Sequence, residues 1–171
     1  MAPFGFIFLA NRGNLTKAKL YEAIRRRLGR EPGCYGVQVR PSRARPRTIE
    51  ARVETAEFLG RAYAVDDATL TVRFSYPRAV GYEYYIIEWS EAARDLGIGW
   101  HQDEDHPDLG ECHFQFDYAG ATIDRRSATF IDEHPLEVLE TRLDQLRAVL
   151  PQIDWAEGEP KLSDDGLPVP E

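Results

Sequence analysis

Three of the four histidines, His101, His106 and His113, lie in one short stretch, WHQDEDHPDLGECHFQFD (residues 100–117). Imidazoles titrate near neutral pH, so a pair of them can act in turn as acid and base. Such a pair suits cleavage of RNA, in which one histidine takes the proton of the 2′-hydroxyl and another donates a proton to the leaving 5′-oxygen. A cation would stabilise the charge of the transition state. The predicted catalytic residues are therefore His101, His106, His113, Arg125 and Arg126.

The elements around these histidines follow from residue alternation. In residues 112–118, CHFQFDY, the apolar side chains share one face of a predicted strand, and His113 lies on the other face with Gln115 and Asp117. If residues 102–111 form a loop between two strands, His101 and His113 stand at its two ends. They could then face each other across the ladder, with His106 at the tip of the loop.

Two other interpretations of this stretch remain open. Histidine, aspartate, proline and glycine are common in polar loops that have no reactive role. Histidines and carboxylates are also metal ligands, but their spacing matches no zinc pattern, and DEDHPDLGE departs from the calcium-loop template. We predict neither a metal nor another cofactor. The sequence contains no P-loop, GxGxxG, GxSxG or HExxH motif.

Charge is distributed unevenly along the chain. The net charge is −8, yet residues 1–50 contain 11 Lys and Arg against 3 Asp and Glu, whereas residues 51–171 contain 10 against 26. A basic segment on an acidic body suggests a contact with something anionic, of which RNA is the candidate and another protein surface the alternative. The predicted nucleic-acid-binding residues are Arg25, Arg26, Arg27, Arg30, Arg40, Arg43, Arg45 and Arg47.

Hydrophobic periodicity predicts an α+β protein, with a mainly antiparallel β-sheet, an N-terminal strand–helix–strand unit and a C-terminal helix packed on the sheet. We expect one domain over residues 1–156. The apolar run 4–10, a helix with a Leu20–Ile24–Leu28 stripe and a strand near residues 34–40 form its first part. Its other parts are a basic, proline-containing link (41–47), a strand-rich body (48–130) and a helix (133–150). Within the strand-rich body, residues 93–100 contain a glycine-punctuated turn.

The remaining composition limits the class of protein. Two cysteines, Cys34 and Cys112, cannot build a disulfide scaffold, so we expect reduced thiols and a cytoplasmic location. No apolar stretch approaches the length of a membrane span. Residues 157–171, EGEPKLSDDGLPVPE, are rich in acids and proline, which predicts a disordered acidic tail.

The order of motifs over residues 82–150 resembles the TumE-like toxins of toxin–antitoxin modules. It consists of an aromatic strand, YEYYIIEWSE, a His-Pro loop, DEDHPDLGECHF, and a closing helix, HPLEVLETRLDQL. His106–Pro107 matches the His-Pro step of that family and His113 one position of its second histidine cluster, whereas Asp103 and Glu104 stand where the family has an Asp-Asn pair. The resemblance implies an intracellular toxin that acts on RNA and is neutralised by an antitoxin partner.

Two hypotheses of function follow from the sequence. The first is a toxin-like, RNA-directed protein, a metal-independent ribonuclease that uses histidine acid–base chemistry. The second is a non-enzymatic adaptor, in which the charged surfaces bind other proteins and the histidine loop only faces solvent. The distance between the ring nitrogens of His101 and His113 separates the two hypotheses, because a phosphate held by both rings requires them within about 7 Å.

Overall fold

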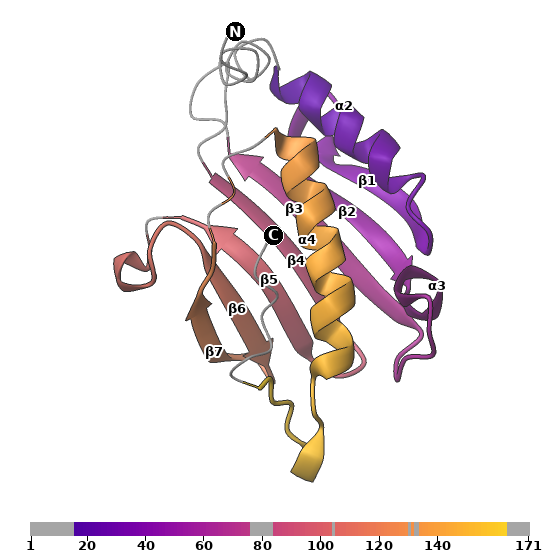
Figure 1. Cartoon of the computed structure of the whole chain (residues 1–171). Coiled ribbons are helices and arrows are strands. Elements are labelled where there is room, and N and C mark those ends of the chain that lie inside the picture. The colour runs from indigo at the N-terminus through magenta and orange to yellow at the C-terminus, as the bar shows by residue number, and fades with distance from the viewer. Residues whose placement is uncertain (1–15, 76–83, 104, 130, 132–133, 164–171) are drawn as a thin grey trace, which may run out of the picture.

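Seven antiparallel strands form one sheet in which each strand pairs with its neighbours in the chain, in the order β1-β2-β3-β4-β5-β6-β7 (Figure 1). The computed structural model describes residues 16–75, 84–103, 105–129, 131 and 134–163. The strands are β1 (Cys34–Ser42), β2 (Arg45–Glu54), β3 (Asp67–Ser75), β4 (Tyr84–Glu91), β5 (Leu96–Gln102), β6 (His113–Tyr118) and β7 (Ala121–Ser127). The predicted α+β class with a mainly antiparallel sheet is confirmed, and the predicted strand at residues 4–10 lies outside the described residues.

Two helices, α2 (Lys17–Leu28) and α4 (Pro135–Val149), lie over the same face of the sheet (Figure 1). A short helix, α3 (Thr55–Leu59), follows β2, and single 3-10 turns occupy Pro107–Leu109, Leu150–Gln152 and Ala156–Gly158. None of the helices among the described residues has the length and apolar character needed to cross a lipid bilayer. We call the sheet surface beneath α2 and α4 the covered face and the opposite surface the open face.

Buried apolar residues alternate with less buried residues along the strands, and the apolar side chains form the core on the covered face. Leu70, Val72 and Phe74 of β3 are almost completely buried, and the residues between them are not. The predicted Leu20–Ile24–Leu28 stripe of α2 packs against this layer, and α4 adds buried Val138, Leu139, Leu143, Leu146 and Val149. Burial of such side chains, each stabilising by roughly 1.5–3 kcal/mol, fixes which face of every strand points away from the helices.

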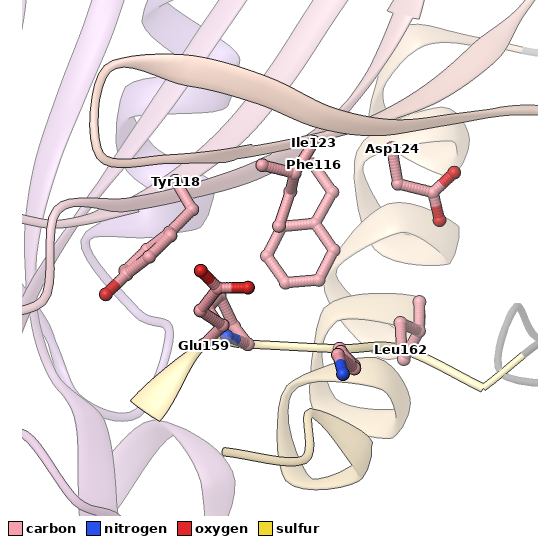
Figure 2. Close-up of a pocket in the computed structure, with 8 residues that line it drawn as sticks. Phe116, Tyr118, Ile123, Asp124, Glu159 and Leu162 are labelled. Atoms are coloured by element: carbon pink, nitrogen blue, oxygen red, sulfur yellow. The ribbon is translucent and has the colours of Figure 1, made fainter. Parts of the chain in front are cut away.

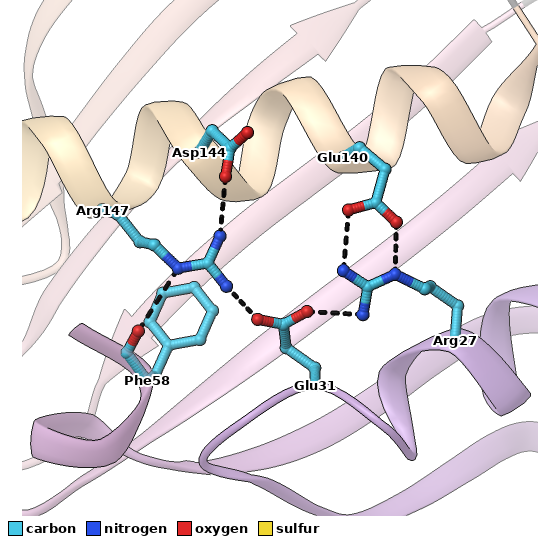
Figure 3. A network of polar contacts seen from close by, with 6 residues as sticks. All are labelled: Arg27, Glu31, Phe58, Glu140, Asp144 and Arg147. Atoms are coloured by element: carbon cyan, nitrogen blue, oxygen red, sulfur yellow. Dashed lines mark hydrogen bonds and ion pairs between the residues drawn. The ribbon is translucent and has the colours of Figure 1, made fainter. Parts of the chain in front are cut away.

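Ion pairs also join the two helices (Figure 3). Glu31, only 4% exposed, receives hydrogen bonds or ion pairs from both Arg27 and Arg147. Arg27 Nη2 also donates to Glu140 Oε2 at 2.7 Å, and Arg147 Nη1 donates to Asp144 Oδ1 at 2.8 Å. We call these five residues the helix network.

Several predicted boundaries are corrected by the structure. The basic segment 41–47 is not a link but the end of the β1–β2 hairpin, where Pro41 pairs with Pro46. Proline is tolerated there because the β2–β3 ladder begins only at Ile49, so neither missing N–H is needed by a third strand. Strand β2 stops at Glu54, whose side chain caps α3 by accepting a hydrogen bond from the Glu57 backbone N–H at 2.7 Å.

The region 93–100, predicted to contain a glycine-punctuated turn, has its turn over residues 92–95, which include no glycine, and its other residues form most of β5. Its glycines allow close approach rather than a turn, because a Cβ at Gly99 would lie 2.5 Å from the carbonyl oxygen of Ile87 on β4. The predicted disordered tail 157–171 is wrong for its first part, since Lys161 bridges to Asp154 and Leu162 is buried. Residues 164–171 lie outside the described residues.

Candidate functional site

His101 and His113 face each other across the β5–β6 ladder, as the alternation of the sequence predicted. Their ring centroids are 5.3 Å apart and the ring planes are inclined by 63°. Both side chains lie on the open face, since the residues that neighbour them in sequence, Trp100 and Phe114, belong to the core on the covered face. The site is therefore positioned by two strands of a rigid sheet, rather than by a loop alone.

His106 does not project into solvent from the tip of the loop. Its ring centroid lies 4.8 Å from that of His113, with the planes nearly perpendicular. The 3-10 turn at Pro107–Leu109, in which the Leu109 N–H donates to the carbonyl of His106 at 2.9 Å, folds the loop back. The neighbouring rings leave His113 only 1% exposed, although its strand position is on the open face.

Two carboxylates that the sequence analysis did not select complete the cluster. Asp103 Oδ1 lies 3.9 Å from His113 Nδ1, and Glu88 Oε2 lies 3.5 Å from His101 Nε2. His101, Asp103 and His113 each offer one possible ligand atom, and these atoms all lie within 4.8 Å of one another. We call His101, His106, His113, Asp103 and Glu88 the histidine site.

Burial sets the protonation of His113. Loss of solvent lowers its pKa, and the neighbouring His101, His106 and Arg125 lower it further, whereas Asp103 opposes the shift. The ring is therefore neutral at pH 7. Its Nε2 atom is buried and has no hydrogen-bond partner among the described residues. Buried side-chain polar atoms are usually bonded, so this nitrogen calls for an explanation beyond packing.

The two arginines proposed from the sequence lie on different faces of β7. Arg125 pairs with Gln115 in register, donates to Gln115 Oε1 at 3.1 Å and shares the open face with the histidines. Arg126 pairs with Phe114 and donates to the backbone oxygens of Leu162 and Ser163. The structure therefore brings Arg125, and not Arg126, to the face of the histidine site, because successive strand residues point to opposite sides.

The eight N-terminal arginines do not form one surface. Arg25 and Arg26 bond to Glu22 on the same helix, α2, and Arg27 belongs to the helix network. Arg40 pairs with Glu50 at 3.2 Å on the open face. The others, Arg30, Arg43, Arg45 and Arg47, are exposed, and no ion pair to them is found among the described residues.

A basic residue missed by the sequence analysis lies in line with the histidines. Successive register pairs join Arg73 to Ile86, Ile86 to His101, His101 to His113 and His113 to Ser127. These five residues form one row across the open face, which we call the histidine row. Only the strand register reveals it, because Arg73 is far from the histidines in sequence.

A groove of about 190 Å³ runs along the end of the sheet where this row lies. It is lined by Arg73, Ser75, Tyr84, Tyr85, Ile86, Gln102, Asp103 and Asp105. Asp103 thus borders both the groove and the two facing histidines. The histidine site is accordingly buried at His113 but open on the side of Asp103, whose side chain is 24% exposed.

A second pocket, of about 400 Å³, lies between the β6–β7 hairpin and the segment 159–162 (Figure 2). Its walls include Phe116, Tyr118, Ile123 and Asp124, with Glu159 and Leu162 across from them. It contains no histidine or cysteine and no part of the histidine row. The chemistry-bearing residues are concentrated elsewhere, on the open face.

Comparison of the chain with protein-family models, with curated proteins and with solved structures yields no match. The resemblance to TumE-like toxins therefore stays a prediction, and what the chain does has to be argued from the geometry of its own residues.

Proposed function

We propose that the protein binds single-stranded RNA across the open face of its sheet and cleaves a phosphodiester bond at the histidine site. The observation that carries this proposal is the histidine row, which aligns an exposed arginine with two facing imidazoles on one rigid surface. Their possible ligand atoms lie within 4.8 Å, inside the roughly 7 Å that a phosphate between two hydrogen bonds requires.

Arginines in line with the histidine row are placed to bind phosphates of the RNA backbone. Arg73 and His101 are two strands apart, which corresponds to about 10 Å at the usual strand spacing. Arg40, paired with Thr48 one residue beyond the Ile49–Val72 pair, continues the row toward the edge of the sheet. Arginines spaced along a surface bind successive phosphates, and this attraction weakens as salt is added.

The same face offers a surface for bases. Tyr84 alternates with Ile86 along β4, so both lie on the open face, and both line the groove beside Asp103. Bases stack on aromatic rings with little sequence preference, which contributes about 1–3 kcal/mol per base. We therefore expect binding of single strands rather than of duplexes, whose bases are already stacked.

The proposed cleavage transfers the phosphoryl group within the RNA. The 2′-oxygen forms a bond to phosphorus as the bond to the 5′-oxygen breaks, which leaves a 2′,3′-cyclic phosphate and a 5′-hydroxyl. A base accepts the 2′-hydroxyl proton, and an acid donates a proton to the 5′-oxygen. His101, whose side chain is 14% exposed, is accessible for one of these roles, whereas direct contact of His113 with RNA requires displacement of His106.

The test uses labelled single-stranded RNA and four proteins: wild type, Arg73→Gln, Arg61→Gln and His113→Ala. Arg61 is the matched control, because it is exposed but follows α3 at the opposite end of the sheet. We expect Arg73→Gln to weaken binding several-fold at low salt and to reduce the salt slope by about one, with Arg61→Gln unchanged. We expect His113→Ala to bind RNA without cleaving it.

A second candidate, a non-enzymatic adaptor, is favoured by the edge of the sheet. β7 has a neighbour on one side only, and Ile123 on it is 46% exposed beside the second pocket. An exposed edge strand can add a strand from a partner protein. Wild-type protein that is folded but neither binds nor cleaves RNA would contradict the first proposal and leave the adaptor.

A further inference from the structure

We infer that His101, Asp103 and His113 bind a divalent transition-metal ion of the zinc class. Their ligand atoms are already gathered within 4.8 Å, whereas two ligands of one tetrahedral zinc ion lie about 3.3 Å apart, given bonds of about 2.0–2.1 Å. Closing this difference requires side-chain movements of roughly an ångström. Two imidazoles and a carboxylate favour zinc or a similar metal over calcium and magnesium, which prefer oxygen ligands only.

A second observation points independently to a ligand. His113 is 1% exposed, and its Nε2 atom has no hydrogen-bond partner among the described residues. A histidine that only fills the core usually has its polar nitrogens bonded, so a buried nitrogen without a partner is unusual for a purely structural residue.

The charges around the site suit a cation. Asp103 lies beside His113, and Asp105 and Asp108 occupy the same loop. These carboxylates would repel an RNA phosphate that approached the histidines directly. An ion bound by Asp103 would neutralise part of this charge and would lower the pKa of a bound water molecule. The ion itself does not depend on RNA, and only its catalytic role rests on the proposed function. With the ion bound, His101 would be a ligand, and a water molecule on the ion, instead of this imidazole, would take the acid–base role.

The surroundings of His101 resemble those of metal-binding histidines, which usually have a carboxylate or carbonyl near the ring nitrogen that does not bind the ion. Glu88 Oε2, 3.5 Å from His101 Nε2, is placed to orient that ring and leaves its other nitrogen for the ion. His106, whose ring centroid lies 4.8 Å from that of His113, covers that ring but is not among the three residues whose ligand atoms are gathered. The inferred site therefore has three protein ligands and one exchangeable position, the arrangement of catalytic zinc sites.

The test is calorimetric titration of zinc chloride into untagged, full-length protein that has first been treated with a chelator. Asp103→Asn and Asp108→Asn form a matched pair, because both remove one charge from the same loop and only Asp103 is an inferred ligand. We expect one zinc ion per wild-type chain, a Kd at least 100-fold weaker for Asp103→Asn, and a Kd within threefold of wild type for Asp108→Asn.

Cobalt gives a second readout, because visible absorption of bound Co²⁺ reports tetrahedral ligation directly. We expect His113→Gln to lose this absorption and His134→Gln, altered at the α4 cap, to keep it. Equal zinc affinity in wild type and Asp103→Asn, or no stoichiometric binding to folded wild type, would overturn the inference. Zinc binding without RNA cleavage would instead contradict only the proposed function, and cleavage by zinc-free protein would contradict only the catalytic role of the ion.

Discussion

The helix network and the histidine site are both polar clusters around one buried residue, Glu31 or His113, but within the described part of the chain only the helix network gives its buried residue hydrogen-bonding partners. In the network, Glu31 is held by Arg27 and Arg147, and these arginines are held in turn by Glu140 and Asp144 (Figure 3). In the histidine site, His113 Nε2 has no hydrogen-bond partner among the described residues. A cluster with matched charges stabilises the fold, whereas an incomplete one is a candidate for binding.

The two clusters also differ in where the sheet places them. The network joins α2 to α4 above the covered face, where the core is continuous. The histidine site lies on the open face, where no described helix covers it (Figure 1). The comparison therefore yields opposite expectations for the two clusters: substitutions in the network should change stability, and substitutions in the histidine site should change ligand binding.

The largest expected effect on stability is that of Glu31→Gln, which removes the charge shared by Arg27 and Arg147. We expect unfolding by urea to show a loss of about 2 kcal/mol, below the 3–5 kcal/mol typical of fully buried pairs because both arginines are partly exposed. The control Glu140→Gln, at the more exposed end of the network, should cost about 0.5 kcal/mol. Equal costs for the two variants would show that burial does not rank these contacts.

The opposite behaviour is expected of His113→Leu in metal-free protein. This change replaces a buried nitrogen that lacks a partner with an apolar group of similar volume, so the free energy of unfolding should stay within about 1 kcal/mol of wild type. The measurement is urea unfolding in the presence of a chelator. A loss above about 3 kcal/mol would place His113 among the structural core residues instead.

The sequence could predict features that depend on residues close together in the chain. It could not predict features that depend on pairing between distant strands. The alternation of apolar and polar residues in β6 placed His113 on the face opposite to the core side chains. Arg73 and Glu88 were missed because they reach the histidines only through strand register, two strands and one strand away from His101. That register depends on the pairing of the whole sheet, which no local pattern contains.

The burial of His113 also could not be inferred from its strand. A polar face predicts exposure, and only the return of His106 over the ring reverses it. The number of charges was equally uninformative for the N-terminal arginines, since Arg27 is bound by Glu140 from a helix distant in sequence. The composition identifies a basic segment, but it does not show which of its arginines form ion pairs within the protein.

A smaller effect is expected from pH. Burial lowers the pKa of His113 in the folded protein, so the unfolded chain takes up this proton first as the pH falls below about 6.5. The contribution of His113 to stability is therefore complete above that pH and is lost as the pH falls toward the folded pKa. Urea unfolding of metal-free protein from pH 7.5 to 5 should show a smaller loss for His113→Leu than for wild type. Identical profiles would mean that His113 titrates as in the unfolded chain.

The last prediction concerns the reactivity of the thiol of Cys112. This residue precedes His113 in the chain, but its side chain points to the covered face. Burial raises its pKa, and Arg142 Nη2 and the Tyr85 hydroxyl lie 3.4 and 3.7 Å from its sulfur. Burial likewise raises the pKa of Cys34 to about 11. Both thiols should react with a disulfide reagent at pH 8 roughly 100-fold more slowly than in urea. Equal rates in the folded protein and in urea would show that burial does not protect these thiols.

The most direct test of a functional histidine site is RNA cleavage by one preparation in two states, stripped of metal and reloaded with one equivalent of zinc. Wild type, His113→Leu and Glu31→Gln would be compared at a temperature where all three are folded. We expect cleavage by zinc-loaded wild type and by zinc-loaded Glu31→Gln, and none by His113→Leu or by any stripped protein. Cleavage by His113→Leu at the wild-type rate, or none by folded, zinc-loaded wild type, would contradict the assignment of RNA cleavage to the histidine site.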